Sequence, residues 1–413
     1  MVYETGDIAW MLVSAALVLI MTPAVGFFYG GMLRKNSMLS ILGQTIIIMG
    51  IATIVWVTFG FSLAFGPDTA GLIGSFDFAF LHGIGIGNSP PDLSYFPTTI
   101  PPLLYMMFQG MFAIITAALI IGGIAERMKL RTVVLFMAIW ITLIYPLVAH
   151  WVWGGGWIHQ LGALDFAGGT VVHISAGAAT LAAALVIGKR MSAQRGEVDQ
   201  PHNIPFVVLG GALLWLGWFG FNGGSALGAN DVAVNAFVTT QIAAATAGVS
   251  WGLISYLHLG RTSVMGMITG AVVGLVAITP AAGFVDVFGA LAIGAVSPIF
   301  SYAAIHLRKR MGFDDALDVW ACHGVGGTVG AVATGLLATS AVNDAIPDGL
   351  LYGGSIDLLG IQLFAVIVVW AFVFAATYAI MWTITKVIPD WRMTREEERI
   401  GPDIVQHGES AYS

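Results

Sequence analysis

The chain consists of long apolar runs separated by short polar segments, and short alternating strands do not appear in it. A membrane-spanning helix needs about 20 consecutive, largely apolar residues. Eleven runs meet this requirement, and we predict a helix in each: 8–33, 38–65, 100–125, 132–154, 168–188, 204–224, 235–258, 263–281, 286–307, 315–339 and 358–385. We therefore expect an all-α polytopic membrane protein and not a barrel.

The positions of the basic residues test this count, because cytoplasmic loops collect Lys and Arg. All 16 Lys and Arg residues follow an odd-numbered run. Arg34 and Lys35 follow the first run, for example, and Arg261 follows the seventh. This alternation predicts eleven transmembrane helices with the N-terminus outside and the C-terminus inside. We accordingly divide the chain into a transmembrane domain, 1–385, and a cytoplasmic C-terminal tail, 386–413.

Composition leads to the same class of protein. The sequence is 57% apolar and 9% charged, whereas a soluble globular protein carries roughly 25% charged residues. A soluble enzyme and a disordered protein are therefore excluded. The net charge of −7 does not indicate nucleic-acid binding, which requires clustered Lys and Arg on an accessible face. No Lys or Arg precedes the first run, so we expect a retained span and not a signal peptide.

The two halves of the chain resemble each other weakly. FYGG at 28–31 ends the first run, and FNGG at 221–224 ends the sixth. GGTVVHISAG at 168–177 in the fifth run resembles CHGVGGTVG at 322–330 in the tenth, and each contains one His. Because a shift of five spans reverses direction across the membrane, spans 1–5 and 6–10 are predicted to form an inverted repeat. Such repeats are common in transporters.

The matched segments each contribute a histidine, His173 and His323, deep inside a predicted span. Helical rise places His173 about 24 Å and His323 about 20 Å from the inner membrane edge. An ionisable group in the bilayer costs several kcal/mol unless it is paired or faces water. A single histidine would be interpreted as a structural residue satisfied by a neighbouring helix. For a matched pair we favour a path for a small polar molecule or a proton relay.

Other ionisable residues of the spans are few. Asp165 precedes His173 by eight residues; it either favours a nearby cation or caps the helix, and one residue can do both. We predict no metal site, because two histidines and one distant carboxylate do not form a closed ligand set. The single cysteine, Cys322, is expected to be a small core residue. The remaining histidines, among them His150, are expected to be solvated or to cap helices.

Aromatic residues crowd the outer ends of the spans, including Trp153 after the fourth and Phe221 near the end of the sixth. An interfacial aromatic belt explains most of them. The alternative is a vestibule that binds cations through cation–π contacts. Phe112 lies about 22 Å of helical rise from the inner end of its span. It therefore shares the depth of His173, which is too deep for a belt, and it is a core or gate residue.

Several segments together resemble the ammonium transporter family, the Amt/Mep/Rh proteins. They are GGMLRKNS (30–37), ALIIGGIAERMKLR (118–131), YPLVAHWVWGGGW (145–157), GALDFAGGTVVH (162–173), WFGFNGGSA (218–226), CHGVGGTVG (322–330) and HGESAY (407–412). The resemblance extends from the first run to the C-terminus, and the two histidine segments are its most specific part. Eleven spans and this tail fit the microbial Amt branch better than the Rh branch.

This resemblance implies a multi-pass ammonium transporter of the cell membrane that serves nitrogen uptake, built as a homotrimer with one pore per subunit. It implies substrate recruitment by Trp153, Phe112, Ser225 and Asp165, a gate of Phe112 and Phe221, and a pore lined by the twin histidines His173 and His323 and by Trp218. Ammonium would leave its proton behind and cross the apolar stretch as ammonia, which potassium cannot do, and the proton would cross separately through the histidine pair as a further hypothesis.

The resemblance also concerns the tail, which in this family usually docks under the trimer and takes part in regulation by PII proteins. Here Pro402 replaces the usual Leu of the GLD segment at 401–403. An ammonium sensor that signals through its tail is the alternative function, although such sensors tend to carry an appended soluble domain. A membrane-embedded enzyme is disfavoured, because no nucleophile–base pair is present. No cofactor is expected.

Overall fold

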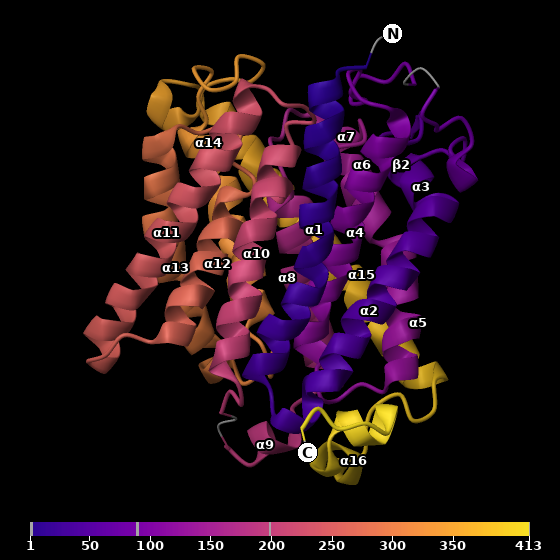
Figure 1. Ribbon diagram of the computed structural model, residues 1–413, viewed down its shortest axis with the longest axis vertical. Coiled ribbons are helices and arrows are strands. Elements are labelled where there is room, and N and C mark those ends of the chain that lie inside the picture. The colour runs from indigo at the N-terminus through magenta and orange to yellow at the C-terminus, as the bar shows by residue number, and fades with distance from the viewer. Residues whose placement is uncertain (1–2, 88–90, 198–199, 413) are drawn as a thin grey trace.

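The computed structural model describes residues 3–87, 91–197 and 200–412, so Ser413, the last residue of the predicted tail, lies outside the described chain. Helices dominate the described residues and run roughly along the long axis of the molecule (Figure 1). The start of α1 lies at one end of this bundle, and α16, close to the C-terminus, lies at the other (Figure 1). This placement agrees with the odd number of crossings predicted from the sequence.

Within the described residues, a helical segment coincides with each of the eleven predicted runs. The first five are α1 (Thr5–Met32); η1 (Lys35–Ser37), α2 (Met38–Val55), η2 (Trp56–Gly60) and α3 (Phe61–Phe65) in line; α4 (Pro102–Ile124); α5 (Leu130–Leu143) with α6 (Tyr145–Val152); and η4 (Gly169–Ile174) with α8 (Ser175–Ile187). The other six are α10 (Ile204–Gly224), α11 (Asp231–Leu259), α12 (Val264–Ile278), α13 (Val287–Met311), η5 (Trp320–Val325) with α14 (Gly326–Leu337), and α15 (Ile356–Val387).

The number of membrane crossings stays a prediction. Nine helical stretches of the described chain are long and apolar enough to cross a membrane by length and composition. The exceptions are α12, which has 15 residues, and the η5–α14 segment, which combines a π-helical turn of 6 residues with an α-helix of 12. The orientation of the bundle is likewise a prediction from the basic residues.

The remaining elements are short and connect the long helices. They are the antiparallel strands β1 (Asp68–Thr69) and β2 (Ile73–Gly74), the helices η3 (Ala79–Leu81), α7 (Trp157–Gln160), α9 (Met191–Gln194) and η6 (Leu350–Tyr352), and, in the tail, α16 (Arg395–Ile400) and η7 (Asp403–His407).

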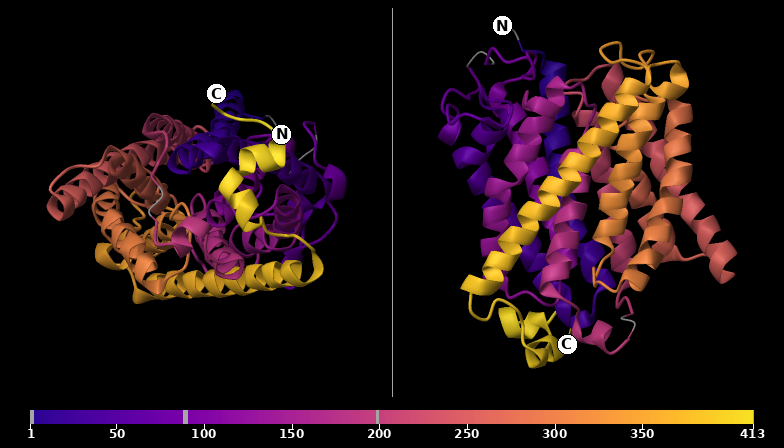
Figure 2. Two further views of the ribbon diagram at one scale, coloured as in Figure 1. Left: turned by 90° about the horizontal axis from the view of Figure 1, so that it is seen from below. Right: turned by 180° about the vertical axis from the view of Figure 1, so that it is seen from behind.

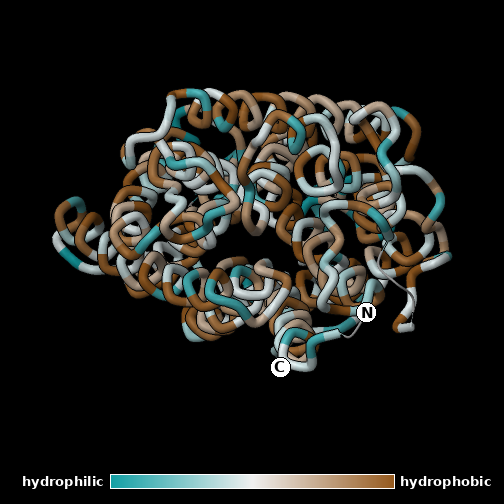
Figure 3. The backbone as a smooth tube through the Cα atoms, turned by 90° about the horizontal axis from the view of Figure 1, so that it is seen from above, coloured by the Kyte–Doolittle hydropathy of each residue, from teal (hydrophilic) through white to brown (hydrophobic). Residues whose placement is uncertain are grey.

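Apolar side chains cover the outside of the bundle as well as its core. Helix α4 is buried nearly all round, as expected of a helix that is apolar on every face. Helix α15 instead crosses the outside of the bundle obliquely (Figure 2), and its Ile367 is 63% exposed. Hydrophobic residues predominate along most of the backbone (Figure 3). Such a surface is stable against lipid and not against water.

The first helices of the two predicted repeats, α1 and α10, pack closely against each other. Glycine permits this approach. A Cβ atom on Gly210 would overlap the main chain at Phe28, and one on Gly220 would overlap the main chain at Ser14. Small residues at such contacts let two helix backbones approach and gain van der Waals contact, which drives helix association in membranes.

A cluster of charged side chains lies between the bundle and the tail. The buried Glu126 accepts hydrogen bonds from Arg34 Nε at 2.9 Å, Ser37 Oγ at 2.6 Å and Arg190 Nη1 at 3.1 Å. Burial by itself would raise the pKa of Glu126, but the guanidinium groups of Arg190 and Arg34 and the Ser37 hydroxyl hold this pKa below its usual value. Glu126 also has a φ of 64°, a strained conformation that this network stabilises.

Of the two roles expected for His150, a solvated residue or a helix cap, the first is wrong, because His150 is 0% exposed, and the second agrees with its contact to the last turn of α3. Its Nδ1 lies 2.9 Å from the carbonyl oxygen of Ala64, and its Nε2 lies 2.8 Å from Asp68 Oδ1. Both ring nitrogens of His150 therefore face oxygen atoms of other segments. The resulting pair joins the β1–β2 hairpin to α6. The two partners lie 82 residues apart, so the sequence could not reveal this contact.

We predict that Glu126→Gln lowers the free energy of unfolding by about 3 kcal/mol, because it removes the buried charge that Arg34 and Arg190 share. The folded-state pKa of Glu126 lies below its unfolded value. Its stabilising contribution is therefore present above the unfolded pKa, about 4.3, and is lost as the pH falls through the folded value. Thermal unfolding of the purified protein between neutral pH and about pH 3 measures both effects.

Glu197→Gln is the matched control, because the Glu197 side chain is 57% exposed in its pair with Arg195. This control should cost at most about 0.5 kcal/mol. Equal losses in the two variants would contradict the prediction, as would an unchanged pH dependence in Glu126→Gln.

Candidate functional site

A single carboxylate organises the start of η4. Asp165 Oδ1 accepts hydrogen bonds from the backbone amides of Gly168 at 2.9 Å and Gly169 at 2.6 Å. Asp165 Oδ2 accepts from the amides of Thr170 at 2.8 Å and Val171 at 3.1 Å, and also from the Thr170 hydroxyl. These are the orphan donors of a helix start. The capping interpretation of Asp165 is therefore confirmed, and both of its oxygens are engaged by this role.

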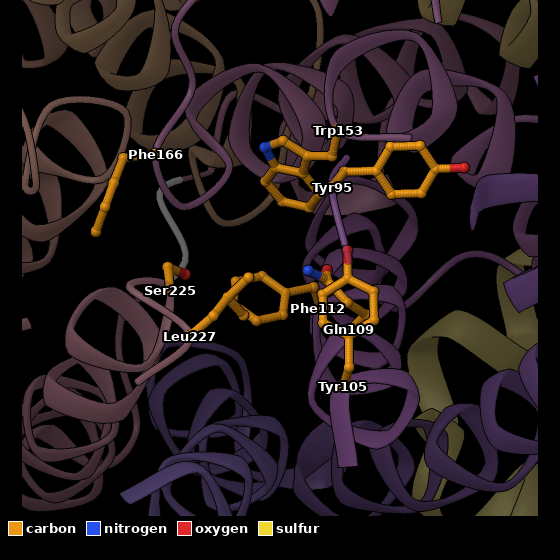
Figure 4. A pocket seen from close by; sticks show the side chains of 8 residues that line it. All are labelled: Tyr95, Tyr105, Gln109, Phe112, Trp153, Phe166, Ser225 and Leu227. Carbon is orange, nitrogen blue, oxygen red and sulfur yellow. The ribbon is translucent and has the colours of Figure 1, made fainter. Parts of the chain in front are cut away.

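A cavity of about 130 Å³ lies beside the C-terminal ends of α6 and α10 (Figure 4). It is lined by Tyr95, Tyr105, Gln109, Phe112, Trp153, Phe166, Ser225 and Leu227. Three of the four residues predicted for substrate recruitment, Phe112, Trp153 and Ser225, meet here. Asp165 does not line the cavity, but its main-chain carbonyl accepts a hydrogen bond from Trp153 Nε1 at 2.8 Å. The helix cap thereby also orients the indole.

A chain of aromatic rings leads from this cavity to the histidines. Phe112 contacts Trp153 edge-on, with ring centroids 5.8 Å apart. Phe112 and Phe221 are both buried, and their centroids are 4.4 Å apart at an angle of 47°. The two predicted gate residues are thus in contact but tilted, not stacked in parallel. Beyond them, Phe221 and Trp218 each stack on His173, at 5.9 Å and 5.4 Å.

The two histidines meet in the interior. Nδ1 of His173 and Nδ1 of His323 are 3.2 Å apart, although the residues are separated by 150 positions. One of these nitrogens must carry hydrogen and the other must accept it, so both rings can be neutral. Nε2 of His173 is buried and has no hydrogen-bond partner among the described residues. The pair can therefore offer a further donor or acceptor to a small polar molecule.

Glycine brings the two histidine segments into reach of each other. A Cβ atom on Gly177 of α8 would overlap the main chain of Gly324. A Cβ atom on Gly327 would lie only 2.8 Å from the carbonyl oxygen of Gly169 and 3.1 Å from the Cβ of His173. The glycine-rich sequence around each histidine is therefore a packing requirement, because only a close approach of these backbones lets the two imidazoles meet.

Polar residues of the cavity wall, Tyr105 and Gln109, were not among those predicted from the sequence. Tyr105 and Gln109 precede Phe112 by seven and three residues, so all three lie on one face of α4. A glutamine within an otherwise apolar helix was the available signal. Thr279 was also missed, and its hydroxyl accepts a hydrogen bond at 2.8 Å from Nε1 of Trp218. This contact holds the predicted pore-wall residue in place.

No group of three or more His, Cys, Asp or Glu side chains that could hold a metal ion occurs in the described ranges. Cys322 is buried beside His323.

Comparison with known proteins shows which family this chain resembles. The chain matches the model of the Ammonium Transporter Family over residues 9–412. It is 46% identical over 410 residues to an ammonium transporter of Bacillus subtilis, with 99% of each chain covered. It superimposes on the crystal structure of Candida albicans Mep2 with a TM-score of 0.87 and 36% identity, over 93% of this chain and 85% of that one. A structure titled Sensor Amt Protein also matches, with a TM-score of 0.87, 31% identity and coverage of 97% and 98%.

We predict that Asp165→Ala destabilises the protein by at least about 3 kcal/mol, because several buried donors would lose their acceptor at once. Asp165→Asn keeps one acceptor oxygen and should lose less. Thermal unfolding in detergent is the measurement, and Asp77→Ala, at an exposed position, is the control. The capping role is refuted if Asp165→Ala unfolds at the temperature of the control.

Proposed function

Because this protein belongs to the ammonium transporter family, we propose that it moves ammonium or ammonia through a pore. This pore passes the aromatic rings of Phe112 and Phe221 and then the paired histidines. Members of this family are multi-pass membrane transporters and not enzymes. The observation that carries the proposal is the contact between His173 and His323, which are both buried deep in the bundle. Ionisable residues are rare inside membrane-spanning segments, and where they occur they typically mark the path of a transported molecule.

Recruitment is proposed for the cavity between Trp153, Phe112 and Ser225. Its volume of about 130 Å³ leaves room for an ammonium ion, since about 10–15 Å³ of such volume already holds a water. The faces of the Trp153 and Phe112 rings attract a cation by about 0.5–2 kcal/mol each. The Ser225 hydroxyl donates to the Phe221 carbonyl at 2.8 Å, so its oxygen is available to accept an N–H of the ion.

Asp165 is proposed to stabilise this cavity without touching the ion. Its carboxylate is buried and caps η4, so its negative charge favours a cation near the end of this helix. It also holds Trp153 through its main-chain carbonyl. Both effects are indirect, which agrees with the absence of Asp165 from the cavity lining.

The tilted pair of Phe112 and Phe221 is proposed as the gate. A dehydrated potassium ion finds no ring of carbonyl oxygens beyond it. Ammonium can instead leave its proton behind and pass as neutral ammonia along His173, His323 and Trp218. Selectivity would then arise because a bare ion is expensive in this apolar passage.

The histidine pair is also proposed to carry the released proton. Each imidazole has one nitrogen that donates and one that accepts, and the two Nδ1 atoms are already in contact. A proton can therefore enter at one ring and leave from the other. In this mechanism the proton and ammonia travel separately and the net transported species is ammonium.

We further propose a homotrimer with one such pore per subunit, a cytoplasmic tail of residues 386–413, and a PII-family regulator at the cytoplasmic face. The docking of the tail supports this arrangement. Asp403 accepts hydrogen bonds from the backbone amides of Ser40 at 2.8 Å and Leu39 at 3.1 Å. Pro402 has a φ of −64°, which proline adopts without strain, so its presence is compatible with a docked tail.

The proposed transport is tested in proteoliposomes on a solid-supported membrane that receive a pulse of ammonium. We expect a saturable current that an equal pulse of potassium does not evoke. Internal alkalinisation without current, followed with a trapped pH dye, would instead indicate a passive ammonia channel. The absence of both signals would refute transport and favour the sensor function. The match to Sensor Amt Protein keeps this function as the second candidate.

His173→Ala should reduce the ammonium-evoked current about tenfold or more, or make the pore permeable to potassium, because it removes one half of the relay. His82→Ala, at an exposed position, is the matched control and should conduct as the unmodified protein does. A His173→Ala variant with unchanged current and unchanged selectivity would refute the relay.

A further inference from the structure

One side of the cavity is polar and lies on α4. Tyr105 and Gln109 lie one helical turn apart on α4 and both line the cavity. Gln109 is 8% exposed, and a buried amide costs free energy unless it is hydrogen-bonded. In the view of Figure 4, the Gln109 amide and the Tyr105 hydroxyl lie on the opposite side of Phe112 from Ser225.

The other polar groups of the lining are already committed. The Tyr95 hydroxyl contacts the carbonyl oxygens of Phe65 at 3.2 Å and Gly66 at 3.1 Å. Its proton is therefore directed into the protein and not into the cavity. The indole N–H of Trp153 is likewise used by Asp165. An occupant of the cavity can thus meet the oxygen of Ser225 on one side and the Gln109–Tyr105 pair on the other.

We propose that Gln109, supported by Tyr105, is a specificity-determining residue that selects ammonium over N-methylated ammonium ions in this cavity. Ammonium presents four N–H donors in a tetrahedron. The aromatic faces and Ser225 satisfy some of them, and the carbonyl oxygen of Gln109 accepts another. An amide can rotate to present its oxygen to a cation. This inference rests on the proposed function, because it concerns the same cavity.

The physical reason for selectivity is the pairing of buried polar groups. Methylammonium has one N–H fewer and carries an apolar methyl group. If that methyl group faces Gln109, the carbonyl oxygen of Gln109 receives no hydrogen bond from the ion. If the ion turns, it loses a contact with Ser225 or a ring. A site built to hydrogen-bond its ligand rejects an analogue that lacks the donor more strongly than an apolar pocket does.

The test measures half-saturating concentrations of ammonium and methylammonium for the full-length protein in proteoliposomes. The ratio of methylammonium to ammonium values is the readout, since a general loss of folded protein does not change it. Gln109→Leu should lower this ratio about tenfold, because one buried hydrogen bond to a charged group is lost for ammonium. Tyr105→Phe should lower it to a smaller extent.

Tyr95→Phe is the matched control, because it removes a hydroxyl of the same cavity that points into the protein. Its ratio should equal that of the unmodified protein. The proposal is overturned if Gln109→Leu and Tyr105→Phe keep the unmodified ratio, or if Tyr95→Phe lowers it equally. If Gln109→Leu does not fold, Gln109→Asn, which withdraws the amide by one methylene, must give an intermediate ratio.

A parallel binding measurement distinguishes failure of the proposed transport from failure of the proposed role of Gln109. Ammonium chloride and methylammonium chloride should raise the thermal unfolding temperature at different concentrations, and this difference reports binding without transport. A protein that binds with the expected ratio but moves no substrate would refute the transport and keep the role of Gln109. A transporting protein whose ratio is insensitive to Gln109→Leu would refute only the role of Gln109.

Discussion

The structure depends on one constraint, which is that a polar group enclosed by an apolar bundle must find its partner within the protein. No water competes for these groups, so each unsatisfied donor or acceptor costs free energy. Asp165 meets the constraint by accepting the free amides of η4, and His173 meets it with His323. Nε2 of His173 is buried and has no partner among the described residues, so it can still bond a small polar molecule.

Close backbone packing is what allows these pairs to form. Two segments that each begin with a π-helical turn lie very close to each other at Gly177 and Gly324. This close approach lets the imidazoles of His173 and His323 meet. The same principle operates between α1 and α10, where Gly210 packs on the main chain at Phe28. In a membrane, where lipid is as apolar as leucine, such van der Waals contact replaces the hydrophobic effect as the force between helices. The glycine content of the chain therefore serves both the fold and the site.

The two ends of the bundle show different solutions to the burial of charge. At the tail end, Glu126 is surrounded by Arg34 and Arg190, so opposite charges compensate each other and the tail packs against a rigid surface. At the other end, Asp165 is stabilised by hydrogen bonds from backbone amides and not by basic side chains of the kind that surround Glu126. Ion pairs and backbone amides are thus two different ways of stabilising a buried carboxylate.

The sequence by itself determined the helical class, the position of every long helix and the identity of the two histidines. Apolar run length and the placement of Lys and Arg are local properties, and the bilayer imposes them on each span separately. Only the tertiary structure decided which side chains meet. It placed Gln109 and Tyr105 in the wall of the cavity with Trp153, left Asp165 outside that wall, and buried His150 against Asp68. These contacts join residues far apart in the chain, and their geometry depends on how closely glycine-rich helices pack, which no local pattern specifies.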